Sequence, residues 1–298
     1  MIRILSLVEN TAGAPGLLGE HGLAMWIEIG GKNVLFDTGQ GGALLPNAQQ
    51  LGVPLERTNA IVLSHGHYDH TGGLAAALER TRKPTLYAHP DAFEAKFACD
   101  PGGARRDIGI AEADRNAARE RTSEVIATKG PVEIVPGLFA TGPVPRETEY
   151  EKTSGPFFLD PECRRPDPMN DDQALFFDTN EGTVVLLGCA HAGVVNTLVH
   201  VQRLAGGKPI REVIGGMHLG NASQERLDRT VEAFREMDIQ CLRPAHCTGA
   251  HAVARIRDAF PDRCESWPVG TRTNFAGAPS PSGPPPRRNN LEGEPRHE

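Results

Sequence analysis

The chain has 298 residues, 39% of them hydrophobic, so it is long and apolar enough to bury the core of one large domain or two small ones. Its formal net charge of −7 argues against nucleic-acid binding, because affinity for a phosphate backbone comes from clustered lysines and arginines. We therefore expect a globular protein that acts on a small molecule. A phosphorylated substrate stays compatible with this charge, because one arginine or metal ion can hold a phosphate locally.

The N-terminal residues MIRILSLVEN predict a short strand and lack the features of a secretory signal. Nowhere do about 18 apolar residues run together, so we expect no contact with a membrane and a cytoplasmic location. No two cysteines are spaced as CxxC, which makes a zinc ribbon or a disulfide framework improbable. We therefore predict reduced thiols at all six cysteines, which are Cys99, Cys163, Cys189, Cys241, Cys247 and Cys264.

The first half of the chain alternates between strand-like and helix-like patterns. Residues 2–8, 24–29, 33–37, 60–64 and 85–88 have the apolar or alternating patterns of strands. Helical spacing is found at 42–51 and 73–80. The polar, charge-dense stretch at 94–129 looks like an insertion, and its composition suits a helical lid or a mobile segment.

The second half repeats this outline without a visible sequence repeat. Strands are predicted at 174–179, 183–188, 212–216 and 239–244, and helices at 193–205, 223–237 and 249–260. The pattern predicts an α/β fold in which two mixed sheets pack face to face with the helices outside. Residues 1–275 would form this domain, and the Pro-rich polar residues 276–298 would be a disordered tail.

A cluster of ionisable side chains directly follows the predicted strand at 60–64. Residues 60–73 read AIVLSHGHYDHTGG and contain His65, His67, Asp69 and His70. Imidazole and carboxylate groups bind zinc, manganese or iron. Because alternate residues of an extended turn point the same way, His65 and His67 are predicted to share one metal, while Asp69 and His70 face a second position. The alternative, a solvated polar loop, is disfavoured by the apolar strand before the cluster.

The segment SHGHYDHTGG resembles the HxHxDH signature of the metallo-β-lactamase superfamily. The segments LVENTA, EHGLAMWIEIGGKNVLFDTG, LGCAHAGVVNTL, GGMHL and RPAHCTG resemble, more narrowly, a subgroup labelled dihydropterin-ribofuranosylaminobenzene-phosphate synthase-like. The resemblance covers about residues 1–275. It implies a four-layer αβ/βα sandwich. It also implies one or two divalent transition metals, with zinc as the first choice and manganese or iron as alternatives. A homodimer is compatible with it.

The same resemblance implies further members of the metal site. His191 would join His65 and His67, and His246 would join Asp69 and His70; a hydrogen-bonded core or helix-capping role is the alternative for each. The aspartate of LFDTGQ, Asp37, would support the metal loop from behind its ligands.

Two departures from the superfamily pattern concern the remaining ligands. Cys189 stands where many members have a bridging aspartate, and ATGPVPRE replaces a GHT-type turn. Either His191 substitutes for the missing histidine, or the site is less symmetrical and holds one metal tightly and one weakly. Cys189 is either a thiolate ligand or a small residue that packs beneath the site.

Residues near these motifs are candidates for contacts with the substrate. Arg146, on a Pro-flanked loop, could clamp a phosphate or carboxylate, with a solvated surface arginine as the alternative. His218 follows a strand and two glycines, and could donate a proton or bind substrate, with a packed core histidine as the alternative. Asp172, with its neighbour Asp171, could buttress ligands. His21 and Asn10 are substrate-contact candidates from the resemblance.

These features predict a metal-dependent hydrolase in which Asp69 orients an activated water and His218 acts as a second catalytic group. The substrate expected from the resemblance and from Arg146 is a small phosphate ester, a cyclic phosphodiester or a pterin-like phosphate. Two alternatives remain open: a synthase or transferase that acts on a dihydropterin-type substrate, and a metal-binding module without turnover.

Overall fold

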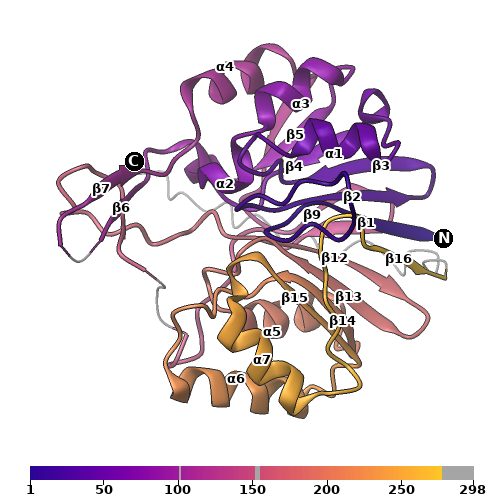
Figure 1. Ribbon diagram of the computed structural model, residues 1–298, viewed down its shortest axis with the longest axis vertical. Coiled ribbons are helices and arrows are strands. Elements are labelled where there is room, and N and C mark those ends of the chain that lie inside the picture. Colours follow the sequence, from indigo (N-terminus) through magenta and orange to yellow (C-terminus); the bar gives the residue numbers. More distant parts are fainter. Residues whose placement is uncertain (101, 152–154, 277–298) are drawn as a thin grey trace, which may run out of the picture.

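The computed structural model describes residues 1–100, 102–151 and 155–276 (Figure 1). Two mixed β-sheets lie face to face, and helices cover the outer face of each sheet. The predicted α/β four-layer sandwich is therefore confirmed. From residue 277 onward the predicted tail lies outside the described residues, and the assignment of residues 1–275 to one domain stays a prediction.

The first sheet carries the strand that leads to the histidine cluster. Its first four strands in sheet order are antiparallel neighbours, and its last four are parallel. The predicted strand bounds at 2–8, 24–29 and 85–88 are confirmed. The order is β16 (Arg272–Phe275), β1 (Ile2–Val8), β2 (Ala24–Ile29), β3 (Lys32–Phe36), β4 (Ala60–Val62), β5 (Thr85–Ala88) and β8 (Glu124–Ala127).

The second sheet is built from the other half of the chain. The pairs β13–β14 and β14–β15 are parallel, so the ends of these strands meet at one edge, where His191, His218 and His246 follow them. The order is β15 (Cys241–Ala245), β14 (Ile210–Gly216), β13 (Gly182–Leu187), β12 (Ala174–Thr179), β10 (Leu138–Ala140) and β9 (Val132–Val135).

Helices complete the outer layers, and each predicted helix is present within two residues of its predicted bounds. In the part of the chain that the structure describes, no helix is long and apolar enough to cross a membrane. Beside the first sheet lie α1 (Leu44–Gln50), α2 (Tyr68–Thr71), α3 (Leu74–Arg80) and α4 (Glu112–Glu120), and over the second lie α5 (Val194–Leu204), α6 (Gln224–Glu236) and α7 (Ala250–Ala259). Three short 3₁₀ turns are η1 (Leu55–Arg57), η2 (Pro90–Phe93) and η3 (His246–Thr248).

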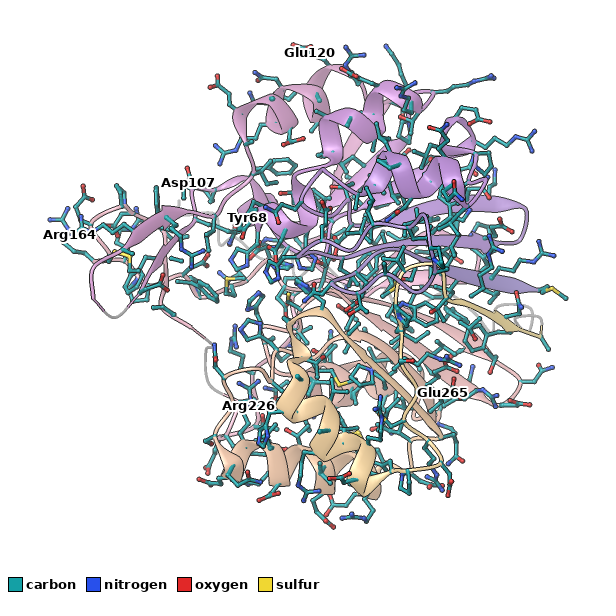
Figure 2. The ribbon with its side chains drawn as sticks, viewed as in Figure 1. Tyr68, Asp107, Glu120, Arg164, Arg226 and Glu265 are labelled. Atoms are coloured by element: carbon teal, nitrogen blue, oxygen red, sulfur yellow. A yellow bond between two sulfur atoms is a disulfide. The ribbon has the colours of Figure 1, made fainter. Side chains whose placement is uncertain are left out.

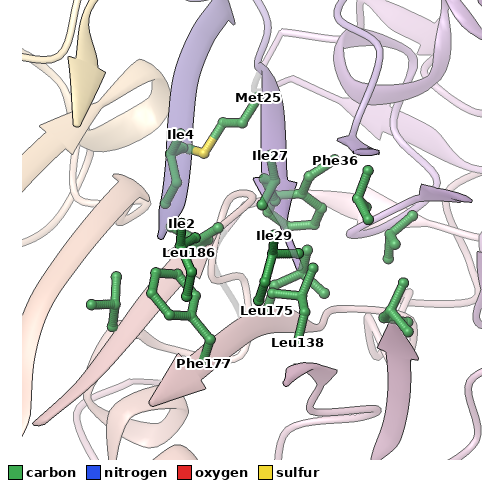
Figure 3. Close-up of a cluster of buried hydrophobic side chains, with 14 of the residues drawn as sticks. Ile2, Ile4, Met25, Ile27, Ile29, Phe36, Leu138, Leu175, Phe177 and Leu186 are labelled. Atoms are coloured by element: carbon green, nitrogen blue, oxygen red, sulfur yellow. The ribbon is translucent and has the colours of Figure 1, made fainter. Parts of the chain in front are cut away.

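Successive side chains of a strand point to opposite faces of its sheet, and in this protein both faces are covered by apolar residues. In β12, Leu175 and Phe177 belong to the cluster between the sheets, whereas Phe176 packs under the outer helices. Figure 3 shows the inner cluster, in which Ile2 and Ile29 from the first sheet lie beside Leu186 and Leu175 of the second. Both sheets are thus covered on both sides, which is typical of strands with near-continuous apolar sequences.

Only part of the predicted insertion at 94–129 projects from the sandwich. β6 (Phe97–Cys99) and β7 (Arg105–Asp107) pair with β11 (Phe157–Phe158) in a small sheet that stands out to one side in Figure 1. The rest of the stretch forms α4, which contacts α3, and β8, which pairs with β5. The sequence of α4, EADRNAARE, contains many charged residues, so the buried face that includes Ala117 and Ala118 gives only a weak apolar pattern.

The prediction of reduced thiols is wrong for one pair of cysteines. Cys99, at the end of β6, forms a disulfide with Cys163, 64 residues further along the chain. Cys189, Cys241, Cys247 and Cys264 are free, as predicted. No spacing motif marks the bonded pair, because the two cysteines meet only when β11 pairs with β6.

The inner cluster generates a stability prediction. Phe177→Ala should lower the free energy of unfolding by about 3–5 kcal/mol, because Phe177 is fully buried between the sheets and its loss leaves a cavity. Leu18→Ala is the control: Leu18 is 47% exposed, so the change should stay within about 0.5 kcal/mol. Chemical denaturation measures both, and equal losses would contradict the placement of Phe177.

Candidate metal centre

The fully buried carboxylate of Asp37 ties the histidine cluster to the end of the first sheet. Asp37 follows β3, and its Oδ1 accepts a hydrogen bond from the Ser64 backbone N–H at 2.7 Å. Its Oδ2 accepts from the Ser64 hydroxyl and from Nδ1 of His70, both at 2.7 Å. One side chain thus fixes the start of the loop and one of its histidines.

Hydrogen bonds behind three of the histidines decide which ring nitrogen faces inward. Nδ1 of His70 donates to Asp37, and Nδ1 of His246 lies 3.0 Å from Oδ1 of Asn10. Nδ1 of His65 lies 2.9 Å from the Ser64 hydroxyl, which already donates to Asp37 and so accepts here. In each ring Nε2 is the nitrogen that faces the centre, which is the arrangement found in metal-ligating histidines.

The inward nitrogens converge in pairs. Nε2 of His65 lies 3.2 Å from Nε2 of His191, and Nε2 of His70 lies 3.2 Å from Nε2 of His246. Cys189 lies between the two pairs, with Sγ 3.1 Å from Nε2 of His70. Donor atoms within 4.8 Å of one another form the groups His65/Cys189/His191, His70/Cys189/His246, Cys189/His218/Cys247 and His21/Asp69/His246.

Asp69 connects the second pair to the solvent-facing side of the site. Its Oδ2 lies 3.2 Å from Nε2 of His246 and 3.2 Å from Nε2 of His21. Although burial opposes the charge, His70, His21 and His246 hold the pKa of Asp69 well below its usual range. The hydrogen bond with Asp69 raises the pKa of His21, so this half-exposed ring carries positive charge more readily than a free histidine.

Burial sets the charge of the remaining rings. It lowers the pKa of His65 and His191 well below the usual range and lowers that of His67 to about 3. His67 is outside the four donor groups, but its ring centre lies 4.6 Å from that of His65, and its buried Nε2 has no hydrogen-bond partner among the described residues. For His70, burial is outweighed by the carboxylates of Asp37 and Asp69, which raise its pKa to about 9.

Two adjacent aspartates hold the loops that carry the first histidine pair. Oδ2 of Asp171 accepts from the backbone N–H of Gly66 at 2.8 Å, and Oδ2 of Asp172 accepts from that of Ala192 at 2.8 Å. Lys96 is fully buried and donates to Asp171 at 3.0 Å and to Asp167 at 2.7 Å. Burial raises the pKa of Asp172 to about 6.

Glycines allow the strand ends of the two sheets to approach this closely. A Cβ on Gly188, at the end of β13, would lie 2.2 Å from the Ser64 hydroxyl oxygen. A Cβ on Gly216, at the end of β14, would lie 2.3 Å from the Gly188 carbonyl oxygen and 2.7 Å from Sγ of Cys247. A larger residue at Gly188 would push the two halves of the site apart, and one at Gly216 would displace neighbouring strand ends within the second half.

The backbone around the site is also strained. Asp37, Ala190, His218 and His246 have positive φ angles of 58°, 53°, 46° and 49°, a region that side-chain-bearing residues seldom adopt. Such conformations persist where the surrounding structure enforces them, and they gather at functional sites. The four are held at strand ends that lead into the cluster.

A cavity of about 830 Å³ opens beside the cluster. His21 and His218 line it, and so does Phe157 of β11, whose ring centre lies 4.9 Å from that of His67. The ring centre of His218 lies 4.2 Å from that of His191. His218 therefore stands between the histidine pair and the cavity, where the sequence predicted a catalytic or substrate-binding group.

Two residues predicted to contact substrate have other partners here. The guanidinium of Arg146 donates to the carbonyl oxygens of His191 at 2.9 Å and Pro168 at 3.0 Å, and Arg146 does not line the cavity. Asn10 orients His246 through the hydrogen bond described above. Both side chains position the backbone or ring of a candidate ligand.

Several residues of the site were missed by sequence reasoning. Glu9 is buried and accepts the His246 backbone N–H at 2.8 Å, and the quoted segment LVENTA could have drawn attention to it. Lys96 and Phe157 come from segments without a motif of their own. Cys247 directly follows the predicted ligand His246. No signal in the sequence pairs Lys96 with an aspartate 75 residues away.

Comparison with known families and proteins adds to this geometry. Residues 18–200, more than half of the chain, match the family model described as the metallo-beta-lactamase superfamily. A solved structure described as a metal-dependent hydrolase of the β-lactamase superfamily has a TM-score of 0.80 and 28% sequence identity, and the match covers 93% of this chain and 100% of that one.

Two curated proteins of Methanocaldococcus jannaschii are similar over most of the chain. One, named 7,8-dihydropterin-6-methyl-4-(beta-D-ribofuranosyl)-aminobenzene-5'-phosphate synthase, is 28% identical, with 92% of this chain and 97% of that protein covered. The other, an uncharacterized protein, is 35% identical, with 86% of this chain and 93% of that protein covered.

The buried Lys96 generates a prediction for the support of the site. Lys96→Met should lower the free energy of unfolding by about 3–5 kcal/mol, because it leaves two buried aspartates without their cation. Adding Asp167→Asn and Asp171→Asn should recover part of the loss, since the uncompensated charges are then removed.

The exposed Lys32 provides the control for this change, and Lys32→Met should stay within about 0.5 kcal/mol of the parent in chemical denaturation. If Lys96→Met behaved like Lys32→Met, the buried ion group would not stabilise the loop.

Proposed function

The chain belongs to the metallo-β-lactamase superfamily, and on this premise we propose that it is a metal-dependent hydrolase of a small phosphate ester, cyclic phosphodiester or pterin-like phosphate. The observation that carries the proposal is the convergence of two pairs of buried Nε2 atoms, each pair 3.2 Å apart, around the thiol of Cys189. Two lone pairs that face one another at this distance repel unless a proton or a cation lies with them.

The donor set fits divalent transition metals. We assign His65, His67 and His191 to one metal position and Asp69, His70 and His246 to a second. Cys189 would be a further ligand, because its thiol belongs to a donor group with each histidine pair. In support, burial keeps the first three imidazoles neutral, so their lone pairs are free for a cation. The mixture of imidazole, carboxylate and thiol favours zinc, with manganese or iron as alternatives.

When bound, the metal would supply Lewis-acid chemistry, which polarises the bond under attack and lowers the pKa of water to about 7. Asp69 orients the attacking water through the carboxylate that His21 and His246 hold in place. His218 faces the cavity and can donate a proton to the leaving group. Asp37 and Asp172 keep the ligands and their loops in position.

A synthase or transferase reaction is the second candidate. It is favoured by the similarity to the Methanocaldococcus synthase, which extends over 97% of that protein. The same site would then direct an acceptor other than water to the activated centre. Turnover of a generic ester in ¹⁸O-labelled water separates the two, because only hydrolysis places the label in the product.

The hydrolase proposal predicts metal content and metal-dependent turnover. Purified protein should hold about one or two transition-metal ions per chain, and removing them with a chelator should stop turnover of bis(p-nitrophenyl) phosphate or a p-nitrophenyl ester. The double variant His65→Ala, His67→Ala should lose about one metal ion and its turnover while it keeps its melting temperature within a few degrees.

Exposed His251 on α7 provides the matched control, and His251→Ala should keep both metal and turnover. Elemental analysis and initial rates measure the outcome. Protein that has never met a chelator and contains no metal would refute the proposal, and turnover in the double variant would place the active site elsewhere.

Cys189 generates a separate prediction. If its thiolate is shared between the metal positions, Cys189→Ser should weaken zinc affinity at least about tenfold, since even groups behind the ligands change it by about ten- to hundredfold. Cys189→Asp should retain metal and shift preference towards manganese, a harder ion.

Cys264, a buried free cysteine in the helix-covered cluster, is the control, and Cys264→Ser should alter stability without changing metal affinity. Competition titrations with a chromogenic chelator report the affinities. Parent-like zinc affinity in Cys189→Ser would show that Cys189 only packs beneath the site.

A further inference from the structure

The three arginines that line the cavity beside the candidate metal centre differ in their interactions. Three arginines line it: Arg106 from β7, and Arg226 and Arg229 from α6. Arg106 pairs with Asp100 at 3.3 Å, and Arg229 lies 4.2 Å above the ring of Tyr150. Arg226 differs from both, because its Nε and Nη2 are buried and have no hydrogen-bond partner among the described residues.

Glu151 is the acidic side chain that most favours the positive charge of Arg226, but the hydrogen bonds that Glu151 accepts come from other groups. Glu151 is buried, and its two carboxylate oxygens accept the backbone N–H groups of Val195 and Asn196 at 2.9 and 2.7 Å at the start of α5. It also accepts from the Thr148 hydroxyl at 3.0 Å. A guanidinium that is buried without satisfying its N–H groups carries a desolvation cost, and an incoming anion would remove that cost.

The position of Arg226 on its helix adds to this preference. α6 has 13 residues and begins after Ser223, and Arg226 is its third residue. The N-terminus of a helix carries partial positive charge and favours anions. Figure 2 shows Arg226 on the α6 side of the molecule, with Asp107 of β7 above it in this view.

We infer that Arg226 and Arg229 form a subsite for an oxyanion of the substrate, a phosphate or a carboxylate, that is separate from the group attacked at the metal centre. This inference rests on the proposed function and deepens it. His21 and His218 join the same cavity to the histidine cluster, and the aromatic side chains of Tyr150 and Phe157 also line it. A volume of about 830 Å³ is within the range that encloses a whole small organic molecule.

The subsite defines a substrate class. Its members carry a labile bond for the metal centre, a flat or apolar body for the two aromatic rings, and a second, unreactive anionic group for the arginines. Glu149 and Glu225 also line the cavity, and Glu225 lies 4.0 Å from Arg229, so the wall does not attract every anion. An anion gains most where it reaches Arg226, whose Nε and Nη2 have no hydrogen-bond partner in the part of the chain that the structure describes.

The test uses metal-loaded protein and three probes that are not turned over: phenylphosphonate, benzoate and the neutral benzyl alcohol. Isothermal titration calorimetry should show that the parent prefers phenylphosphonate or benzoate to benzyl alcohol. Arg226→Met should weaken binding of the preferred anion about ten- to hundredfold, the loss expected for a charge-assisted hydrogen bond. Arg229→Met should weaken it in the same direction, and it carries the test if Arg226→Met does not fold.

Arg235 provides the matched control, because it lies on the same helix outside the cavity and pairs with Glu232. Arg235→Met should bind the probes as the parent does. Metal content and melting temperature are recorded for each variant. A preference for phenylphosphonate identifies the anion as phosphate, and a preference for benzoate identifies it as carboxylate.

Binding of both anions within twofold of the parent in Arg226→Met and Arg229→Met, at unchanged metal content, would overturn the subsite. Anion binding at the metal centre alone gives that result. Failure of the proposed function looks different: the arginine variants lose the anion, but metal-loaded parent protein turns over no ester.

Discussion

The site depends on one buried carboxylate, that of Asp37, which neighbouring backbone and side chains hold with three hydrogen bonds of 2.7 Å. Because Asp37 follows β3 and Ser64 follows the parallel strand β4, this contact clamps two adjacent strand ends together. It also fixes the tautomer of His70 and, through Ser64, that of His65. A carboxylate with no solvent access is stable only when its oxygens are satisfied, so the loop and the carboxylate stabilise each other.

Much of the fold follows from sequence patterns, because the long strands and helices bury continuous apolar faces. Strands β1 and β2 and helix α5 are predictable from local spacing alone. Short elements such as β16, with the polar sequence RTNF, are stabilised by pairing with β1 and leave no local signal. Sequence reasoning also placed the histidines together, since they follow strand ends that parallel pairing brings to one edge. It could not place Lys96 or the Cys99–Cys163 bond, whose partners meet only in the folded chain.

The two halves of the molecule contribute different side chains to the site. The first sheet supplies the loop with His65 and His70, and the second supplies His191, His218 and the N-terminus of α6. Positive φ angles occur on both sides, and close glycine contacts let the sides meet. Precision at the centre is therefore a property of the interface between the sheets, because a shift of either sheet would change the distance between the Nε2 atoms in both histidine pairs.

The small sheet of β6, β7 and β11 forms one wall of the cavity but contributes none of the donor groups around Cys189. Within this sheet Phe157 packs against His67 and His191, whereas Ala98 of β6 and Arg106 of β7 line the cavity and belong to none of the donor groups. Selection on substrate choice can therefore act on Ala98 and Arg106, while selection on reactivity acts on the strand ends that carry the histidines. Descendants of such a chain could exchange one substrate for another by remodelling a peripheral hairpin, with the reaction itself conserved.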